Sequence, residues 1–93
     1  MELKDTIGMM QSEDYKERFK AEYHQTKTRY EKLKVFNTKI EAKQRECYCA
    51  TPPHPISDPK FDCPPSLLRE QQRVMGEYLH LLELRAEIEH IDL

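Results

Sequence analysis

Hydrophobic positions in the first half of the chain recur with the period of an α-helix. They stand 4, 7, 3 and 7 residues apart, the spacing of one helix face that packs on another helix. Thr26 and Asn37 fill further places of the same heptad pattern. The pattern predicts a long helix with a packing seam, whose apolar or aromatic members are Phe19, Tyr23, Tyr30, Leu33 and Ile40.

We expect this helix to cover residues 12–46, a stretch without proline or glycine. Ser12 is the predicted N-cap, because a serine oxygen can accept a hydrogen bond from a free N–H group of the first turn. Glu13 and Asp14 follow where the helix dipole favours negative charge. At about 1.5 Å per residue, the helix would be roughly 50 Å long.

A second helix is predicted over residues 66–92, with Ser66 as its N-cap. Its apolar residues cover a wider arc than the usual stripe of about 100°. One partner helix cannot cover so wide a face, so we expect self-association, most simply a two-fold dimer that forms a four-helix bundle. The apolar positions are Leu67, Leu68, Val74, Met75, Tyr78, Leu79, Leu81, Leu82, Leu84, Ile88 and Ile91.

Two further segments complete the chain. Residues 1–11 include the apolar residues Ile7 and Met10 and are too short for a stable isolated helix. We expect them to form an arm that docks on the bundle or on a second copy. Residues 47–65 hold all six prolines, which excludes a helix through them and predicts a stiff connector.

The expected fold for residues 1–93 is a single all-α domain, an antiparallel hairpin of two long helices with a short N-terminal helical arm, oligomerising into a helical bundle. Charge favours this pairing. Residues 13–46 carry ten Lys or Arg against seven Asp or Glu, and residues 66–93 carry three against six. Opposite net charges favour contact between the two helices, and we expect no sequence-specific DNA binding.

Sequence motifs of catalysis are missing. The chain has no glycine-rich phosphate loop, no G-x-S-x-G and no H-E-x-x-H, so we expect that it is not an enzyme. No apolar run is long enough to cross a membrane, and the first residues lack the order of a signal peptide. The sequence therefore predicts a cytoplasmic protein without a membrane partner.

Residues of metal-ligating type gather in and beside the connector: Cys47, Cys49, His54 and Cys63. Thiolates and an imidazole could form a tetrahedral zinc site. The spacing differs from that of a standard zinc finger, however, and an odd number of cysteines in a reducing compartment favours free thiols. We expect no cofactor, with zinc held by these four residues as the alternative.

Aromatic and cationic side chains alternate along the first turns of the long helix. Rings can stack on a nucleobase, and guanidinium groups can fork onto phosphate oxygens. The spacing alone favours a plainer interpretation, in which the aromatic residues belong to the seam and the cations form a solvated face. A seam tyrosine still carries a hydroxyl that needs a partner, which makes this end a candidate ligand pocket. The candidate ligand-binding residues are Tyr15, Lys16, Arg18, Phe19, Glu22, Tyr23, Arg29 and Arg85.

Glu22 and Arg85 occupy or border seam positions of the two helices. Antiparallel counting with a shift of about one helical turn brings them level. We expect a partly buried ion pair that fixes the register and leaves donors for a ligand phosphate.

The run from Ser12 to Tyr23, followed by Tyr30 to Leu33, resembles the opening of small helical proteins encoded by tailed phages and bacterial prophages, including relatives in crAss-like gut phages. The resemblance spans almost the whole chain, although Cys47, Cys49 and the proline-rich middle depart from it. In the second half of the chain it is carried by Cys63, Pro64, Gln71, Met75, Tyr78, Leu79, Leu82, Arg85, Ala86, Ile88, Glu89 and Ile91.

The resemblance implies a non-enzymatic phage accessory protein in the cytoplasm of the bacterial host cell. By analogy with the class of small phage proteins that antagonise host antiviral defence, its expected partners are itself and a bacterial nucleotide second messenger, an immune signal that it would sequester. One alternative is a direct protein–protein inhibitor of a host defence protein, for example a CRISPR nuclease, acting through the acidic second helix or the arm. The other is a purely structural helical dimer.

Overall fold

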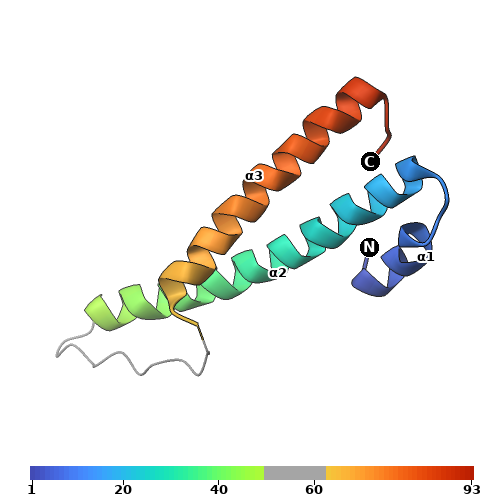
Figure 1. Ribbon diagram of the computed structural model, residues 1–93. Helices are drawn as coiled ribbons and strands as arrows, with labels where there is room; N and C mark the ends of the chain where they lie inside the picture. The colour runs from blue at the N-terminus through green and yellow to red at the C-terminus, as the bar shows by residue number, and fades with distance from the viewer. Residues whose placement is uncertain (50–62) are drawn as a thin grey trace.

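The computed structural model describes residues 1–49 and 63–93, and no strand occurs within these ranges. Helix α3 runs back along α2, so the two long helices form an antiparallel pair in an elongated molecule of 59 × 25 × 18 Å (Figure 1). The prediction of an all-α chain is confirmed. The elements are the 3-10 helix η1 (Leu3–Thr6) and the helices α1 (Ile7–Met10), α2 (Tyr15–Cys49) and α3 (Pro65–Glu89).

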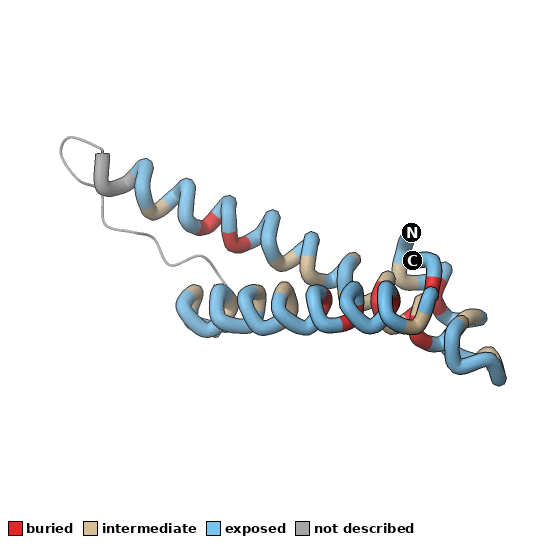
Figure 2. The backbone as a smooth tube through the Cα atoms, turned by 90° about the horizontal axis from the view of Figure 1, so that it is seen from above, coloured by how far each residue is buried: buried red, intermediate tan, exposed pale blue. Residues whose placement is uncertain are grey.

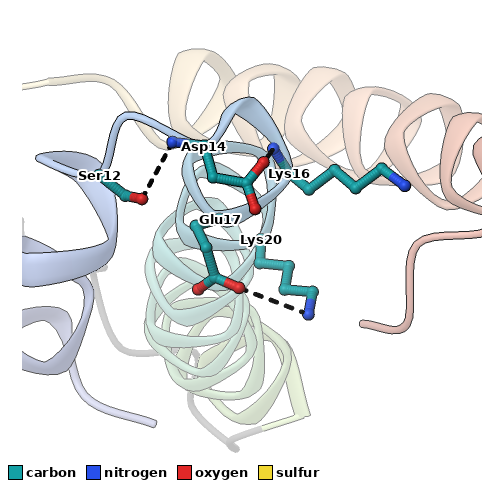
Figure 3. Close-up of polar contacts among 5 residues, drawn as sticks. All are labelled: Ser12, Asp14, Lys16, Glu17 and Lys20. Atoms are coloured by element: carbon teal, nitrogen blue, oxygen red, sulfur yellow. Dashed lines mark hydrogen bonds and ion pairs between the residues drawn. The ribbon is translucent and has the colours of Figure 1, made fainter.

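Asp14, and not the predicted Ser12, caps α2. The Asp14 carboxylate accepts a hydrogen bond from the backbone N–H of Lys16 at 3.0 Å, and its carbonyl accepts one from the N–H of Arg18 at 3.2 Å. The hydroxyl oxygen of Ser12 instead accepts from the N–H of Asp14 at 3.2 Å (Figure 3). The helix therefore begins at Tyr15, because the carboxylate both satisfies a free N–H group and gains from the helix dipole.

Helix α3 begins with a proline instead of following a serine cap. Pro64 is the N-cap in an extended conformation, and Pro65 is the first helical residue, so the prediction of Ser66 as the cap is wrong. Proline suits the first helical position, because the N–H that it lacks would have no partner in the first turn and its ring holds φ near the helical value.

The end of α3 turns the chain back toward the core. His90 adopts a left-handed conformation, with φ 56° and ψ 44°, and the N–H of the next residue, Ile91, donates to the carbonyl of Ala86 at 2.8 Å. Ile91 is consequently buried in the core. The helix ends at Glu89 and does not reach residue 92 as predicted. Burial of the Ile91 side chain in the core stabilises the chain more than another half-turn of exposed helix would.

A small apolar cluster holds α2 against α3 near the two chain ends. It includes two predicted seam residues of α2, and the ring of a third, Tyr30, packs at its edge in the space left by Gly76. Figure 2 shows that most buried positions lie near the labels N and C. The cluster consists of Phe19, Tyr23, Leu79, Leu82, Ala86 and Ile91.

The facing side of α3 follows the same heptad rule as the seam of α2. Its residues alternate spacings of four and three along the helix, and all are buried or half-buried. Two matching seams of this kind are the pattern of an antiparallel coiled-coil pair. The α3 seam residues are Leu68, Gln72, Met75, Leu79, Leu82 and Ala86.

A polar layer interrupts the seam toward the connector. The Asn37 amide nitrogen donates to the side-chain oxygen of Gln72 at 2.9 Å and to the carbonyl of Leu68 at 3.2 Å. Asn37 is buried, and its side-chain oxygen has no hydrogen-bond partner. A buried polar residue in a seam of this kind fixes the register of the two helices at a cost in stability.

The N-terminal arm packs on α2, which is one of the two docking places predicted for it. Thr6 is only 1% exposed, and its hydroxyl donates to the carbonyl of Leu3 at 2.7 Å. On α2, the hydroxyl of Thr28 lies 3.1 Å from the carbonyl of Met1. Figure 1 shows the arm on the side of α2 away from α3. The first half of α2 is therefore covered from two sides.

Much of the wide apolar face predicted for the second helix stays exposed. The far side of α3 from α2 includes Val74, Leu81 and Ile88, each at least half exposed. Within residues 1–49 and 63–93, no helix combines the length and the apolar character needed to cross a membrane.

The polar layer gives a direct stability prediction. We expect Asn37→Leu combined with Gln72→Leu to raise the melting temperature by about 4–8 °C, corresponding to roughly 1 kcal/mol, because the pair removes a buried oxygen without a partner and extends the apolar seam. Asn37→Leu alone should gain less, because it leaves the Gln72 amide without its partner. Thermal melts followed by circular dichroism test this order, and a double variant that melts below the single one contradicts it.

Candidate functional site

A hollow of about 600 Å³ opens between α2 and α3, beside the arm. Most of its wall comes from one face of α2, where Tyr15, Arg18 and Glu22 follow each other at helical spacing. Helix α3 supplies Tyr78 and Arg85. We call this site the basic-aromatic hollow, and its lining consists of Met10, Tyr15, Arg18, Phe19, Glu22, Gln25, Thr26, Arg29, Tyr78 and Arg85.

Aromatic rings form the apolar part of this hollow. Phe19 is buried in the core, and the guanidinium carbon of Arg85 lies 4.8 Å from the centre of its ring. Such stacking of a planar cation on a ring leaves the outer edge of the guanidinium free for an acceptor. Tyr15 and Tyr78 are partly exposed, so their rings are accessible to a planar ligand.

Guanidinium groups give the hollow its positive charge. Arg18 donates to the carbonyl of Ser12 at 2.7 Å, and the Nε of Arg85 donates to Glu89 at 3.0 Å. Among the described residues, no hydrogen bond or ion pair involves the Arg29 side chain. Each of the three arginines therefore retains unused N–H donors that can bind a carboxylate or phosphate.

The predicted ion pair between Glu22 and Arg85 does not form. Both residues line the hollow, but Glu22 accepts a hydrogen bond from the hydroxyl of Tyr78, whereas Arg85 pairs with Glu89 one turn further along its own helix. Tyr78 lies two turns before Arg85 on α3, and its rigid ring spans the gap to α2. A neutral hydroxyl also costs less to desolvate than a second charge.

The tyrosines of the helix pair are held as hydrogen-bond donors. The hydrogen bond to Glu22, together with desolvation, raises the pKa of Tyr78 above its ordinary value. Burial and the nearby carboxylate of Glu83 likewise raise the pKa of Tyr23, whose hydroxyl donates to Glu83 at 3.2 Å. Both hydroxyls therefore keep their protons at neutral pH and tie α2 to α3.

The structure brings together six of the eight candidate ligand-binding residues and separates two from them. Lys16 follows Tyr15 directly and so points about 100° away around the helix, outside the hollow. Tyr23 is 8% exposed and belongs to the core. Four residues of the lining were missed: Met10, Gln25, Thr26 and Tyr78. Gln25 continues the same face of α2, and Tyr78 shares its face of α3 with Arg85. The six residues in the hollow are Tyr15, Arg18, Phe19, Glu22, Arg29 and Arg85.

A second hollow, of about 440 Å³, lies on the opposite flank of α3 and has a different charge. Its lining includes the carboxylates of Glu83, Glu87 and Asp92, and it contains no Lys or Arg. We call it the acidic hollow. It repels anions, so the basic-aromatic hollow is the better site for a phosphorylated ligand.

The zinc alternative falls largely outside the described residues. His54 and the side chains of Cys47 and Cys49 lie there, and Cys63 is exposed. Within the described part of the chain, no group of three or more His, Cys, Asp or Glu residues could hold a metal ion.

Comparison with known proteins relates one segment of this chain to a family. Residues 13–50 are similar to the Sequestin family, a match that covers α2 with its cap and does not include α3. No curated protein and no solved structure matches the chain. The matched segment contains the α2 wall of the basic-aromatic hollow, including Tyr15, Arg18 and Arg29.

Proposed function

We propose that this chain is a non-enzymatic binding protein that captures a nucleotide signal in the basic-aromatic hollow and thereby antagonises host antiviral defence. The observation that carries this proposal is the convergence of three arginines and three aromatic rings around one hollow of about 600 Å³. That volume lies within the range of about 300–1,000 Å³ typical of small-molecule sites.

Each part of a nucleotide has a suitable partner in the hollow. Phosphate oxygens fit the free donors of Arg18, Arg29 and Arg85. A base can stack on the exposed ring of Tyr15 or Tyr78, since every base offers a π-face. One carboxylate oxygen of Glu22 accepts a hydrogen bond from the Tyr78 hydroxyl. The other oxygen remains available to accept a hydrogen bond from an N–H group of the base.

Capture without chemistry is consistent with the groups present. The hollow holds positive charge and rings, which bind and orient a ligand, and its tyrosines keep their protons at neutral pH. The name of the Sequestin family, which residues 13–50 resemble, is consistent with a sequestering role. The resemblance to small phage proteins supports a setting in which the sequestered molecule is an immune signal of the bacterial host.

A direct protein inhibitor is the second candidate function. It is favoured by the arm, where Ile7 is 58% and Met10 is 42% exposed. Exposed apolar side chains on a short docked element are suited to contact with another protein. In this alternative, the arm would cover a surface of a host defence protein.

Self-association belongs to the same proposal. Among the described residues, eight hydrophobic residues are buried, while much of the apolar surface of α3 remains in water. A second copy would cover such a surface and would place two hollows in one particle.

Replacing Arg85 should abolish nucleotide binding without lowering the stability of the folded protein. We expect a tight nucleotide at 100 times its dissociation constant to raise the melting temperature by about 10 °C or more, since it adds roughly 2.7 kcal/mol. Arg85→Leu should melt no lower than the wild type without ligand and should lose this shift. The measurement is a thermal melt against a panel of cyclic and linear nucleotides.

The matched control is Arg45→Leu. Arg45 forms an ion pair of the same i,i+4 type, with Glu41 at 3.0 Å, outside the hollow. This variant should keep the full nucleotide shift. Undiminished binding by a well-folded Arg85→Leu would show that Arg85 serves packing alone and would favour the protein inhibitor.

Glu22→Gln tests whether the carboxylate recognises the base. Glutamine still accepts the Tyr78 hydrogen bond through its oxygen, but its second group is a donor. We expect the dissociation constant for the captured nucleotide to rise about tenfold or more, because a hydrogen bond to a charged group is lost. Isothermal titration calorimetry measures this change. Equal or tighter binding would confine Glu22 to its contact with Tyr78.

Self-association predicts a particle mass above that of one chain. Light scattering at micromolar concentration should give a homogeneous oligomer, most simply a dimer of the 11.2 kDa chain. A mass of one chain over the whole concentration range would contradict it.

A further inference from the structure

One carboxylate contacts two residues of the basic-aromatic hollow without being part of its lining. Glu89 accepts a hydrogen bond from the hydroxyl of Tyr15 on one oxygen, at 3.2 Å, and from the Nε of Arg85 on the other, at 3.0 Å. Tyr15 and Arg85 both line the hollow, whereas Glu89 does not. Glu89 therefore links the first residue of α2 to the end of α3, from outside the hollow.

The place of Glu89 in its helix is unfavourable for a carboxylate. Glu89 is the last residue of α3, and the C-terminal end of a helix carries partial negative charge. Its side chain is only 28% exposed, so the carboxylate has also lost part of its hydration. The hydrogen bonds from Tyr15 and Arg85 compensate for both costs.

Two contacts fix the guanidinium group of Arg85. Its carbon lies 4.8 Å from the centre of the buried Phe19 ring, so one face of the group rests on the core. Glu89 holds the edge that carries Nε. The end of the fork that carries Nη1 and Nη2 remains available for a second acceptor, such as a phosphate. Without Glu89, a long side chain that is 54% exposed would lose one of its two restraints.

The hydroxyl contact likewise restrains the ring of Tyr15. Desolvation and the hydrogen bond to Glu89 raise the pKa of Tyr15 above its ordinary value, so the hydroxyl keeps its proton and donates at neutral pH. Tyr15 is 48% exposed, and so open a side chain would otherwise exchange between rotamers. Held at its hydroxyl, the ring offers a fixed face on which a base can stack.

We propose that Glu89 is a positioning residue of the ligand site, which orders Arg85 and Tyr15 before the ligand arrives. The inference rests on the proposed capture of a nucleotide and deepens it, because it names the group that keeps the empty hollow ready to bind. A ligand that meets ordered side chains does not spend binding free energy on ordering them, so its affinity is higher.

Positioning by Glu89 predicts an effect opposite in sign to that of its charge. The carboxylate places negative charge beside a site for an anionic ligand. Removing that charge should therefore tighten binding if electrostatic repulsion were its main effect. Removing a group that orders Arg85 and Tyr15 should instead weaken binding. The direction of the change distinguishes the two roles.

The first test compares Glu89→Ala with Glu77→Ala. Glu77 is a matched control, because it pairs with Arg73 at 2.8 Å in the same i,i+4 arrangement on α3 and lies outside the lining of the hollow. The probe is the cyclic or linear nucleotide that raises the wild-type melting temperature most. We expect Glu89→Ala to raise its dissociation constant about tenfold, because the nucleotide must then order two side chains itself. Glu77→Ala should leave the constant unchanged in the same calorimetric titration.

Glu89→Gln separates the contacts of Glu89 from its charge. Glutamine has the same length, its oxygen can accept from the Nε of Arg85, and its amide can donate to the oxygen of Tyr15. We expect this variant to bind the same nucleotide within about twofold of the wild type. An equal loss of affinity in the Gln and Ala variants would overturn positioning through these contacts.

A measurement without ligand tests the ordering of Arg85 directly. In the wild type, the Nε–H group of Arg85 should give a slowly exchanging NMR resonance, because it is hydrogen-bonded to Glu89. Arg85→Lys, which lacks this group, assigns the resonance. Glu89→Ala should lose the slow exchange and Glu77→Ala should keep it, while circular dichroism shows equal helix content in both.

The outcomes separate this inference from the proposed function. A wild type that binds no nucleotide would overturn capture, and the Arg85 resonance would then decide whether Glu89 orders the arginine. A wild type that binds, together with equal or tighter binding by Glu89→Ala, would overturn the inference alone. Slow exchange of the Arg85 Nε–H group that persists in Glu89→Ala would overturn it as well.

Discussion

The contact of Phe19 and Tyr23 with Leu79 and Leu82 fixes how α2 lies on α3, and the other features of the molecule depend on it. With that register set, the Tyr78 hydroxyl reaches Glu22, and the arginines of both helices face one hollow. The cluster is small, because one α-helical hairpin encloses little volume. The same limited burial leaves the outer face of α3 uncovered by the other described elements.

The helices and their seams could be predicted because the heptad spacing and the position of the prolines are properties of the sequence itself. The helix ends could not. Ser12 and Asp14 are both good capping residues, and the choice between them depends on which oxygen meets a free N–H group in the folded turn. At the other end, burial of Ile91 decides where α3 stops, and burial is a tertiary property.

The grouping of the candidate site residues could be predicted where they share one helix face. The contacts between residues of two different helices could not. Arg18 and Glu22 belong together by spacing alone, whereas the partner of Glu22 depends on side-chain length as well as register. Arg85 is level with the hollow as expected, yet Tyr78 reaches Glu22 in its place. Tyr23 lies in the seam as predicted but outside the basic-aromatic hollow, because its hydroxyl turns toward Glu83 on the other flank of α3.

The Tyr78–Glu22 contact joins two residues that line the basic-aromatic hollow, so the proposed capture of a ligand there would also affect the lifetime of the protein. A small apolar core favours local opening of a helix pair, and local opening exposes backbone to proteases. A molecule held by Arg18 on α2 and Arg85 on α3 would bridge the two helices and keep them closed. Empty copies would then be degraded faster than loaded ones, and the amount of protein in the cell would follow the amount of its ligand.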